Sequence, residues 1–278
     1  MVKSEMQAML SNDERHWWYR GRRRVIRAAL DTAGLPRDAR ILDAGCGSGR
    51  TLDELADYGS VSGVDMSWDA VAAARSRGHE EVRLGRIEQM PFEDARFDLV
   101  TCLDVIEHTA DDLCTLRELR RVTRPGGLLL VTVPAYPSLW SHHDEVNRHY
   151  RRYRSESLLD AACEAGWDRE RDTYFNSLLL PAAAAVRLAE RSAPDGEPRS
   201  DLARTPRWLN GALELPLRLE ARSVRAGRRL PAGLSLLAMF RNTTAPAPAR
   251  RRRFIARRGA GPERAPLRAR RVPVLPRG

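Results

Sequence analysis

Between residues 40 and 134, short apolar runs of the β type alternate with segments in which apolar residues recur at helical spacing. Strands that alternate with helices form a parallel sheet covered by helices, so we expect an α/β protein. The last helix of this region is expected at residues 110–127, where Pro-Gly-Gly stops it. The expected strands are residues 40–45, 61–65, 82–85, 96–103 and 128–134.

Two further β-type runs, residues 167–175 and 233–242, bring the expected sheet to seven strands. About 57 residues, 176–232, separate these two runs, where a minimal fold would use a short turn. Within this insertion, residues 177–192 and 206–229 are apolar on one side and rich in arginine on the other. We expect them to form a helical lid, inserted between strands 6 and 7, that packs on the core. A dimer face or a contact with a membrane surface are the alternatives.

Three glycines at alternate positions follow the first expected strand in LDAGCGSG, residues 42–49. The dinucleotide pattern G-x-G-x-x-G does not fit, because Arg50 stands where its third glycine would fall. Asp43, just ahead of the glycines, would repel a pyrophosphate and attract a ligand that carries an ammonium and a sulfonium. The second strand ends at Asp65, 18 residues beyond Gly47, close to where an acidic side chain meets ribose hydroxyls in such sheets. These features indicate a cationic nucleoside, S-adenosylmethionine.

Four motifs in order carry a resemblance to a known family: LDAGCGSG, GVD, IEQMPFED and LDVIEH, followed by LRELRRVTRPGGLLLVTVP. Residues 13–175, which contain them, resemble the class I S-adenosylmethionine-dependent methyltransferases, in the broad branch that includes ubiquinone-biosynthesis and sugar methyltransferases. The resemblance implies a Rossmann-like, seven-stranded, mostly parallel sheet with helices on both faces. It also implies an enzyme whose cofactor is S-adenosyl-L-methionine.

The resemblance assigns the cofactor contacts by position. The glycine loop would pass close to the methionine moiety, and Asp65 would bind both ribose hydroxyls. Met66 would lie against the adenine ring, Ile87 would offer its backbone amide to the adenine edge, and Leu103 would line the cleft where the methyl group faces its acceptor. The expected cofactor-binding residues are Asp43, Gly45, Cys46, Gly47, Gly49, Asp65, Met66, Ile87 and Leu103.

One position departs from the pattern of the family. Relatives often read GDAE where this chain has Gly85-Arg86-Ile87-Glu88. Arg86 offers no acceptor to the adenine amino group, so Glu88 or a water would have to take that contact.

A transfer to oxygen or nitrogen that releases a proton needs a base, and histidine is the usual candidate. Three of the six histidines stand in SLWSHHDEVNRHYRRY, residues 138–153, directly after the fifth expected strand. Loops at the carboxyl ends of parallel strands border the ligand site. We expect His143 to be the catalytic base, with Asp144 orienting it and His142 in reserve. The alternative is that these are solvated or structural loop histidines.

The motif LDVIEH places Asp104, Glu107 and His108 at a spacing that would put them on one helical face. Some RNA-end and quinone-pathway methyltransferases with a similar motif use it for a divalent cation. In most proteins with such a motif, these residues serve packing, helix capping and cofactor orientation, so no metal is expected here.

The N-terminal stretch DERHWWYRGRRRVIRAAL is expected to form a helix that begins near Asn12 or Asp13. In relatives a leading helix lies over the cofactor cleft, so Trp17, Trp18 and Tyr19 could wall the acceptor pocket. Packing of the tryptophans against the sheet is the alternative.

The formal net charge of +10 arises entirely from residues 242–278, which contain 11 Arg and one Glu. This segment of Pro, Ala, Gly and Arg has few apolar residues, so we expect a disordered basic tail beyond a methyltransferase domain at residues 1–241. A basic tail suggests nucleic acid. However, Lys3 is the only lysine and arginine dominates the whole chain, so a solvated tail without a nucleic-acid partner is favoured.

The four cysteines have no CxxC spacing and lie in expected regular elements, which favours reduced thiols. The first 20 residues lack the apolar stretch of an export signal, and the longest apolar run, SLLLPAAAAV, is too short to span a membrane. We therefore expect a cytoplasmic protein.

The expected function is transfer of a methyl group to an oxygen or nitrogen of a small-molecule acceptor, such as a sugar or a secondary metabolite. A lipid-linked, polyprenyl-carried glycan at the membrane surface is the alternative acceptor, and RNA or protein is a further one. A non-catalytic binding module is disfavoured because both cofactor motifs are intact.

Overall fold

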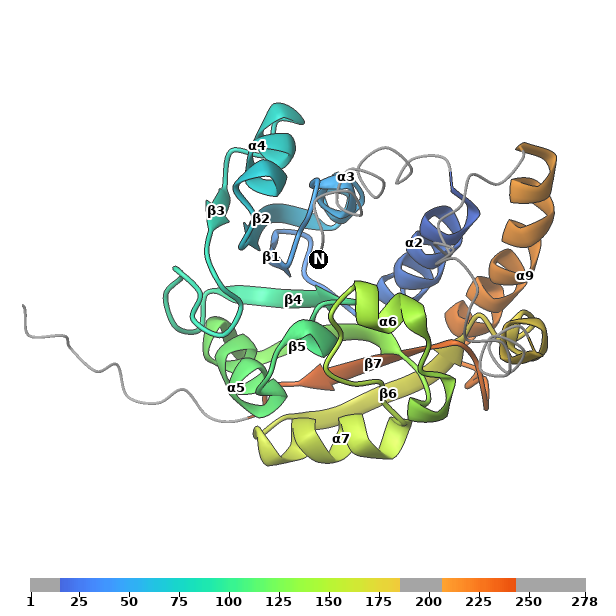
Figure 1. The fold of residues 1–278 in the computed structure, drawn as a ribbon. Helices are drawn as coiled ribbons and strands as arrows, with labels where there is room; N and C mark the ends of the chain where they lie inside the picture. The colour runs from blue at the N-terminus through green and yellow to red at the C-terminus, as the bar shows by residue number, and fades with distance from the viewer. Residues whose placement is uncertain (1–15, 186–206, 244–278) are drawn as a thin grey trace, which may run out of the picture. The chain divides into compact units, whose positions relative to one another are not determined.

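The computed structural model describes residues 16–185 and 207–243. Within these residues, seven strands form one sheet in the order β3-β2-β1-β4-β5-β7-β6 (Figure 1). Strands β1 to β5 pair in parallel, and β7 lies antiparallel between β5 and β6. The predicted seven-stranded, mostly parallel sheet is therefore confirmed. The strands are β1 (Ala39–Ala44), β2 (Gly59–Asp65), β3 (Val82–Leu84), β4 (Phe97–Leu103), β5 (Thr123–Pro134), β6 (Asp168–Phe175) and β7 (Ser235–Arg241).

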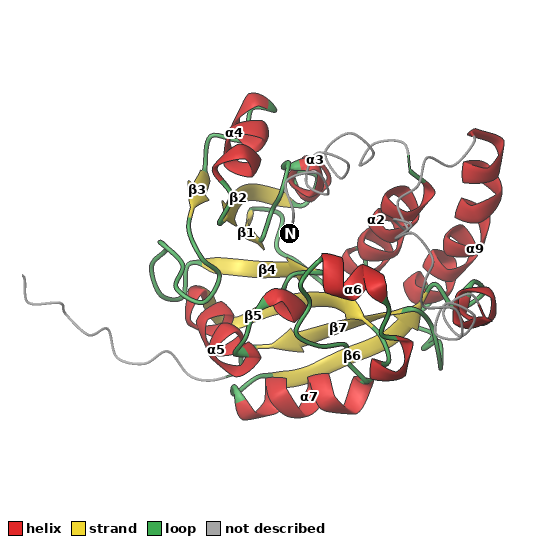
Figure 2. Ribbon diagram, in the orientation of Figure 1, coloured by secondary structure: helices red, strands yellow, loops and turns green. Residues whose placement is uncertain are grey.

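Helices cover both faces of the sheet (Figure 2). They include α2 (Trp17–Leu30), α3 (Arg50–Leu55), α4 (Trp68–Ser76), α5 (Asp112–Val122), α6 (His142–Val146), α7 (Ser155–Glu164) and α9 (Arg207–Arg225), with the 3₁₀ turns η1 (Ile106–His108) and η2 (Pro137–Leu139).

Two hydrophobic layers sandwich the sheet. Helices α5 and α7 pack against one set of strand residues that includes Leu129, and α2 and α9 pack against the other set, which includes Leu130. Successive side chains of a strand point to opposite faces, so neighbouring leucines of β5 reach different layers.

The strand order changes direction between β1 and β4. The chain moves outward from β1 to β3 and then returns to place β4 on the other side of β1. At such a point the connections leave the carboxyl ends of the two strands in opposite directions, and ligands bind there. The glycine loop after β1 and the turn η1 after β4 therefore lie at one edge of the sheet.

Helix α9 comes from the insertion between β6 and β7 and packs along α2 (Figure 1). The helices are so close that a Cβ atom on Gly21 would lie 2.2 Å from Cδ1 of Leu217. The Nε atom of Arg24 also donates to Oε1 of Glu214 over 2.8 Å. Helix α9, within the second predicted lid segment, thus packs on the N-terminal helix, and residues 186–206 lie outside the described part.

One predicted boundary is wrong. The helix expected at residues 110–127 ends at Val122, and Thr123 already belongs to β5, where it pairs with Phe97. The side-chain amide of Asn242 donates to the carbonyl of Thr123 over 2.8 Å, so a contact distant in sequence helps to fix the strand there.

The described residues begin within the predicted N-terminal helix and end within the predicted basic tail. Helix α2 begins at Trp17, with His16 as its N-cap, and the predicted start near Asn12 or Asp13 lies outside the described residues. Of the predicted tail at 242–278, the structure describes Asn242 and Thr243 alone.

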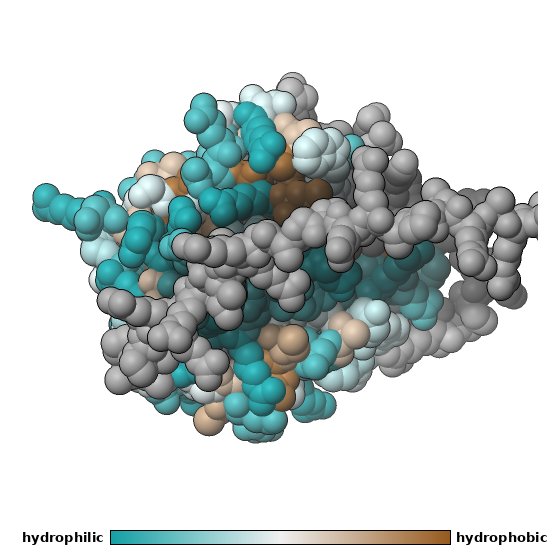
Figure 3. Space-filling model, turned by 90° about the vertical axis from the view of Figure 1, so that its left-hand side faces the viewer, coloured by the Kyte–Doolittle hydropathy of each residue, from teal (hydrophilic) through white to brown (hydrophobic). Residues whose placement is uncertain are grey.

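Among the helices that the structure describes, none has the length and apolar character needed to cross a membrane. On the face drawn in Figure 3, hydrophilic residues predominate and hydrophobic residues occupy smaller areas between them.

Candidate functional site

The glycine loop after β1 requires backbone conformations that other residues rarely adopt. Gly45, Gly47 and Gly49 have φ angles of 84°, 53° and 79°. A Cβ on Gly45 would lie 2.5 Å from Cγ2 of Val105, so the loop also passes too close to the turn after β4 for a side chain. The loop therefore exposes bare backbone between the ends of β1 and β4.

Asp65, at the end of β2, holds this loop from the neighbouring strand. Its Oδ2 accepts from the backbone N–H of Gly47 over 3.0 Å, and its Oδ1 accepts from the N–H of Ser67 over 2.8 Å. Burial raises the pKa of Asp65, although the bonds from Ser67, Gly47 and Met66 oppose that rise. A carboxylate can accept about four hydrogen bonds, so these three backbone bonds leave acceptor capacity for a ligand hydroxyl.

Asp43 lies behind the loop rather than at its surface. Its side chain is buried, and its Oδ1 accepts from the hydroxyl of Thr101 on β4 over 2.6 Å. Burial raises the pKa of Asp43 to about 6, with the Thr101 bond acting in the opposite direction. Asp43 thus places a titratable charge beneath the loop that was predicted to bind a cation.

The predicted adenine side combines an exposed and a buried apolar residue. Met66 is 71% exposed, whereas Ile87, beyond the end of β3, is buried. Glu88 is paired with Arg86, whose Nη2 lies 2.8 Å from its Oε1. The carboxylate suggested as a substitute acceptor for the adenine amino group is therefore already engaged by the residue that departs from the family pattern.

Leu103 ends β4 as a buried residue, and the turn that follows is tied to α2. Asp104 adopts a positive φ of 55°, and its Oδ2 lies 2.7 Å from Nε of Arg22. The N-terminal helix was expected beside the site for its aromatic residues. The connection that the structure shows is made by an arginine that the sequence analysis did not single out.

The two tryptophans of α2 pack against aromatic rings. The ring of Trp18 stacks on Phe175 of β6, with centroids 5.9 Å apart and planes 6° from parallel, and Trp17 meets Trp18 edge to face. The packing alternative therefore holds for Trp18.

The buried carboxylate of Asp144, predicted to orient His143, binds His149, Arg152 and Ser141 in the structure. Its Oδ1 accepts from Nδ1 of His149 and from Nε of Arg152, each over 2.8 Å, and its Oδ2 accepts from the N–H of Ser141. Burial would raise the pKa of Asp144, but the bonds from His149 and Arg152 outweigh it and hold the pKa well below its ordinary value. Adjacent residues of a helix point in different directions, and the carboxylate of Asp144 meets side chains five and eight positions further along the chain.

The two histidines proposed as bases lie in different surroundings. His143 is half-buried beside Asn147, and its ring centroid lies 6.1 Å from that of His149. His142 is largely exposed, with Nδ1 3.5 Å from Oε2 of Glu145.

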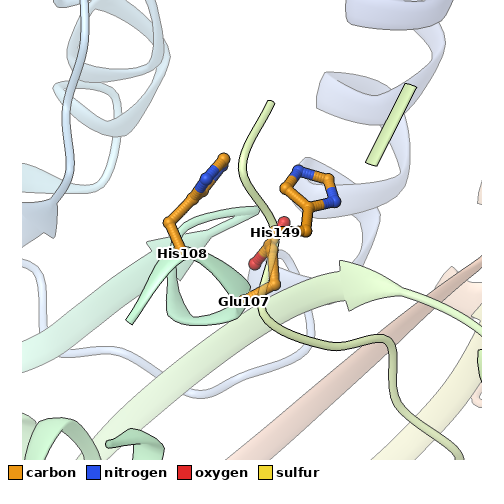
Figure 4. Close-up of side chains that lie close together, drawn as sticks. All are labelled: Glu107, His108 and His149. Carbon is orange, nitrogen blue, oxygen red and sulfur yellow. The ribbon is translucent and has the colours of Figure 1, made fainter. Parts of the chain in front are cut away.

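A second cluster, which the sequence suggested only in part, lies just beyond β4. Glu107, His108 and His149 each place one potential ligand atom within 4.8 Å of the others (Figure 4). Asp104, the first acid of LDVIEH, turns to Arg22 instead, because the motif forms a 3₁₀ turn and not a helix with one common face. The sequence analysis singled out the histidine-rich stretch at residues 138–153. The proximity of its His149 to Glu107 arises only in the fold.

Comparisons with known proteins show what this arrangement is similar to. Residues 42–131 match the family described as Methyltransferase domain. An uncharacterized 37.1 kDa protein in transposon TN4556 of Streptomyces fradiae is 38% identical over 128 residues, which cover 42% of this chain and 37% of that protein. A ubiquinone biosynthesis O-methyltransferase of Xanthomonas oryzae pv. oryzae is 34% identical over 114 residues, covering 38% of this chain and 46% of that enzyme. The chain thus spans less than half the length of these curated relatives.

A solved structure has the same fold. Phosphoethanolamine N-methyltransferase 2 of Haemonchus contortus, in complex with S-adenosyl-L-methionine, superposes with a TM-score of 0.53 at 19% sequence identity. The similarity covers 79% of this chain and 52% of that chain. At this identity it shows the shared architecture of the sheet and its helices.

Proposed function

We propose that this chain, which belongs to the class I S-adenosylmethionine-dependent methyltransferases, moves a methyl group from that cofactor to an oxygen or nitrogen of a small-molecule acceptor. The family membership supplies the reaction class. The residues at the carboxyl edge of the sheet supply the assignment of roles.

The observation that carries the proposal is the position of the Asp65 carboxylate. It is fixed by the N–H groups of Gly47 and Ser67 and keeps acceptor capacity for a ribose hydroxyl. The exposed Met66 beside it offers apolar surface to a purine ring. A ligand with a ribose diol and an adenine but no phosphate fits this combination, as S-adenosylmethionine does.

The bound cofactor supplies an activated methyl group on a sulfonium. For such a one-step displacement, the protein mainly has to hold the acceptor in line with the methyl group and exclude water. Arg22 fastens α2 to the turn after β4, and the N–H of Tyr150 donates to the carbonyl of Glu107 over 2.8 Å. The ion pair fixes α2, and the hydrogen bond fixes the segment beyond α6; both lie beside the turn where we place the acceptor.

We assign His143 as the proton acceptor, with His142 in reserve, because both lie on α6 after β5. Asp144 has a structural role in this assignment: it anchors the segment that carries His143 by binding Ser141, His149 and Arg152. Its removal is expected to displace the whole segment rather than to change one histidine.

Calorimetric titration with S-adenosylmethionine tests the proposal on the wild type and on Asp65→Asn. Asparagine keeps the size of the side chain, but it loses the charge and cannot accept from Gly47 and Ser67 together. Losing a hydrogen bond to a charged group, about 1.5 to 3 kcal/mol, corresponds to roughly 10- to 150-fold weaker binding. Asp94→Asn is the matched control, since that carboxylate is exposed and pairs with Arg121. Equal affinity of Asp65→Asn and wild type, or no binding by the wild type, would overturn the assignment.

A lipid-linked acceptor at a membrane surface is a second candidate, and one observation favours it. Leu215 and Leu219 lie one turn apart on α9 and are 55% and 45% exposed, and the exposed arginines 218 and 222 are interleaved with them. An apolar stripe framed by arginines suits an anionic lipid surface. Co-sedimentation of the full chain with vesicles containing phosphatidylglycerol, compared with Leu215→Ser/Leu219→Ser, separates this candidate from a freely diffusing acceptor.

A further inference from the structure

We propose that Asn176 and Thr132 recognise the methyl acceptor, and that this acceptor is a neutral, hydroxylated compound of the sugar class. The inference rests on the proposed function and assigns residues to its acceptor. Asn176 directly follows β6, and Thr132 lies near the end of β5. Both strands belong to the half of the sheet that α2 and α9 cover on one face (Figure 1).

Unusual backbone conformations gather at the carboxyl edge of the sheet. Within the described residues, five residues other than glycine adopt a positive φ, and three of them follow strands at this edge: Asp104 after β4, Tyr136 after β5 and Asn176 after β6. The three strands run in one direction, because β5 and β6 are both antiparallel to β7. Such conformations persist where the surroundings hold them, and they cluster at ligand-binding sites. We therefore expect the acceptor along the ends of β4, β5 and β6.

The side chain of Asn176 has an unpaired acceptor. Asn176 is 3% exposed, and its Oδ1 has no hydrogen-bond partner among the residues that the structure describes. Its backbone, in contrast, is engaged: the N–H donates to Oε2 of Glu220 on α9, and the carbonyl accepts from the N–H of Leu234. A buried polar group without a partner is costly, so the amide of Asn176 is suited to accept from a ligand hydroxyl.

Thr132 supplies a second unpaired group. It is fully buried, and its Oγ1 has no partner within the described part of the chain. Thr132 pairs in register with Leu103, the residue proposed to line the place where the methyl group faces its acceptor. Leu103 and Leu130 both belong to the layer under α2 and α9, so Thr132, two residues beyond Leu130, faces the same layer. Strands β5 and β6 are two strand spacings apart, about 10 Å, a span that suits one sugar ring with its hydroxyls.

The charged groups beside these residues favour a neutral acceptor. The carboxylate of Glu220 accepts from the backbone N–H groups of Asn176 and Ser177. Asp104 is paired with Arg22, so that the two charges balance each other. An ammonium group or a phosphate on the acceptor would have to compete with these existing partners, whereas a hydroxyl would not.

Aromatic rings add apolar surface next to the polar groups. The half-buried ring of Trp18 stacks on Phe175, the residue that directly precedes Asn176. A sugar presents hydroxyls at its rim and C–H groups on its faces, and this combination matches unpaired hydrogen-bonding groups beside an aromatic pair.

Methyl transfer to a panel of simple compounds tests the residues and the acceptor class together. The full-length chain is incubated with S-adenosylmethionine that carries a tritiated methyl group and with three sets of compounds: methyl glycosides of neutral hexoses and deoxyhexoses, the matching uronic acids, and sugar phosphates. We expect the neutral glycosides to take up the most label. With the best of them, Asn176→Gly and Thr132→Val should each lower kcat/KM by roughly 5- to 100-fold, mainly through KM, because an acceptor hydroxyl loses its partner.

The two substitutions are chosen to preserve the local structure. Glycine adopts a positive φ readily, and valine resembles threonine in shape while it removes a hydroxyl that has no partner. Both variants should keep the wild-type S-adenosylmethionine affinity, and their Tm should fall by no more than about 4 °C. Ala95→Gly, at another positive φ in the turn before β4, is the matched control and should keep full kcat/KM.

The outcomes separate this inference from the proposed function. Wild-type kcat/KM in either variant would overturn the assignment of that residue, as would a joint loss of stability and S-adenosylmethionine affinity, which would show a structural role. A wild type that binds S-adenosylmethionine but prefers the acidic or phosphorylated compounds, or labels none of the panel, would overturn the acceptor class. Absence of S-adenosylmethionine binding, which calorimetry detects without any acceptor, would instead refute the proposed function and this inference with it.

Discussion

Nε of Arg22 lies 2.7 Å from Oδ2 of Asp104, and this ion pair joins the N-terminal helix to the turn that follows the central strand β4. Asp104 adopts a positive φ of 55°, a conformation that is costly for most residues other than glycine. The turn carries Leu103 on one side and Glu107 on the other, so the pair fixes the position of both residues relative to α2.

Arg22→Gln should loosen α2 from this turn. Leaving Asp104 without its partner is expected to lower the free energy of unfolding by about 1 to 3 kcal/mol, because a largely desolvated charge loses its counter-charge. Urea denaturation measures this. A double-mutant cycle with Asp104→Asn isolates the pair, and additive effects of the two substitutions would contradict a direct interaction.

The raised pKa of Asp43 predicts that the free energy of unfolding depends on pH. Its pKa is raised to about 6 in the folded protein by burial, against an ordinary value of 3.8, so its contribution to stability is fully present below about pH 4 and is lost as the pH rises through about 6. Asp43→Asn does not titrate and can still accept from Thr101. Relative to wild type, this variant should therefore gain up to about 3 kcal/mol between pH 4 and pH 7. Urea unfolding of both proteins at unit pH steps gives the difference, and a difference that stays constant with pH would exclude this role for Asp43.

His143→Gln tests the assigned base. Removal of a general base typically lowers kcat by roughly 10² to 10⁴-fold, while S-adenosylmethionine affinity should stay unchanged because His143 is not among the proposed cofactor contacts. Kinetics with an acceptor that the wild type methylates give the rate of transfer. Calorimetry gives the S-adenosylmethionine affinity, so the two quantities are measured separately. His142→Gln is the matched comparison on the same helix. A His143→Gln enzyme with full kcat, together with a slow His142→Gln enzyme, would transfer the role to His142.

The glycine loop and its neighbour Asp65, which are proposed to bind the cofactor, could be predicted because their signals are local. Gly45, Gly47 and Gly49 directly follow a strand, and positive φ angles at a strand-to-helix corner demand glycine whatever surrounds them. Asp65 ends the neighbouring parallel strand, and the β1–β2 pairing brings that strand end alongside the loop.

The segment proposed for the acceptor side could be predicted only as a region. The stretch after β5 was expected near the site, yet the partner of Asp144 proved to be His149 rather than the adjacent His143. Neighbouring residues on a short helix diverge by about 100°, so adjacency in sequence does not imply contact.

The sequence by itself therefore determined the alternating α/β fold, the order of its elements and the glycine loop with Asp65, because hydrophobic periodicity and backbone sterics act over a few residues. The tertiary structure alone decided which distant side chains meet: Arg22 with Asp104, Gly21 with Leu217, and Glu107 with His149. These contacts depend on how helices and loops pack against the sheet, and packing is a property of the whole chain that no local pattern encodes.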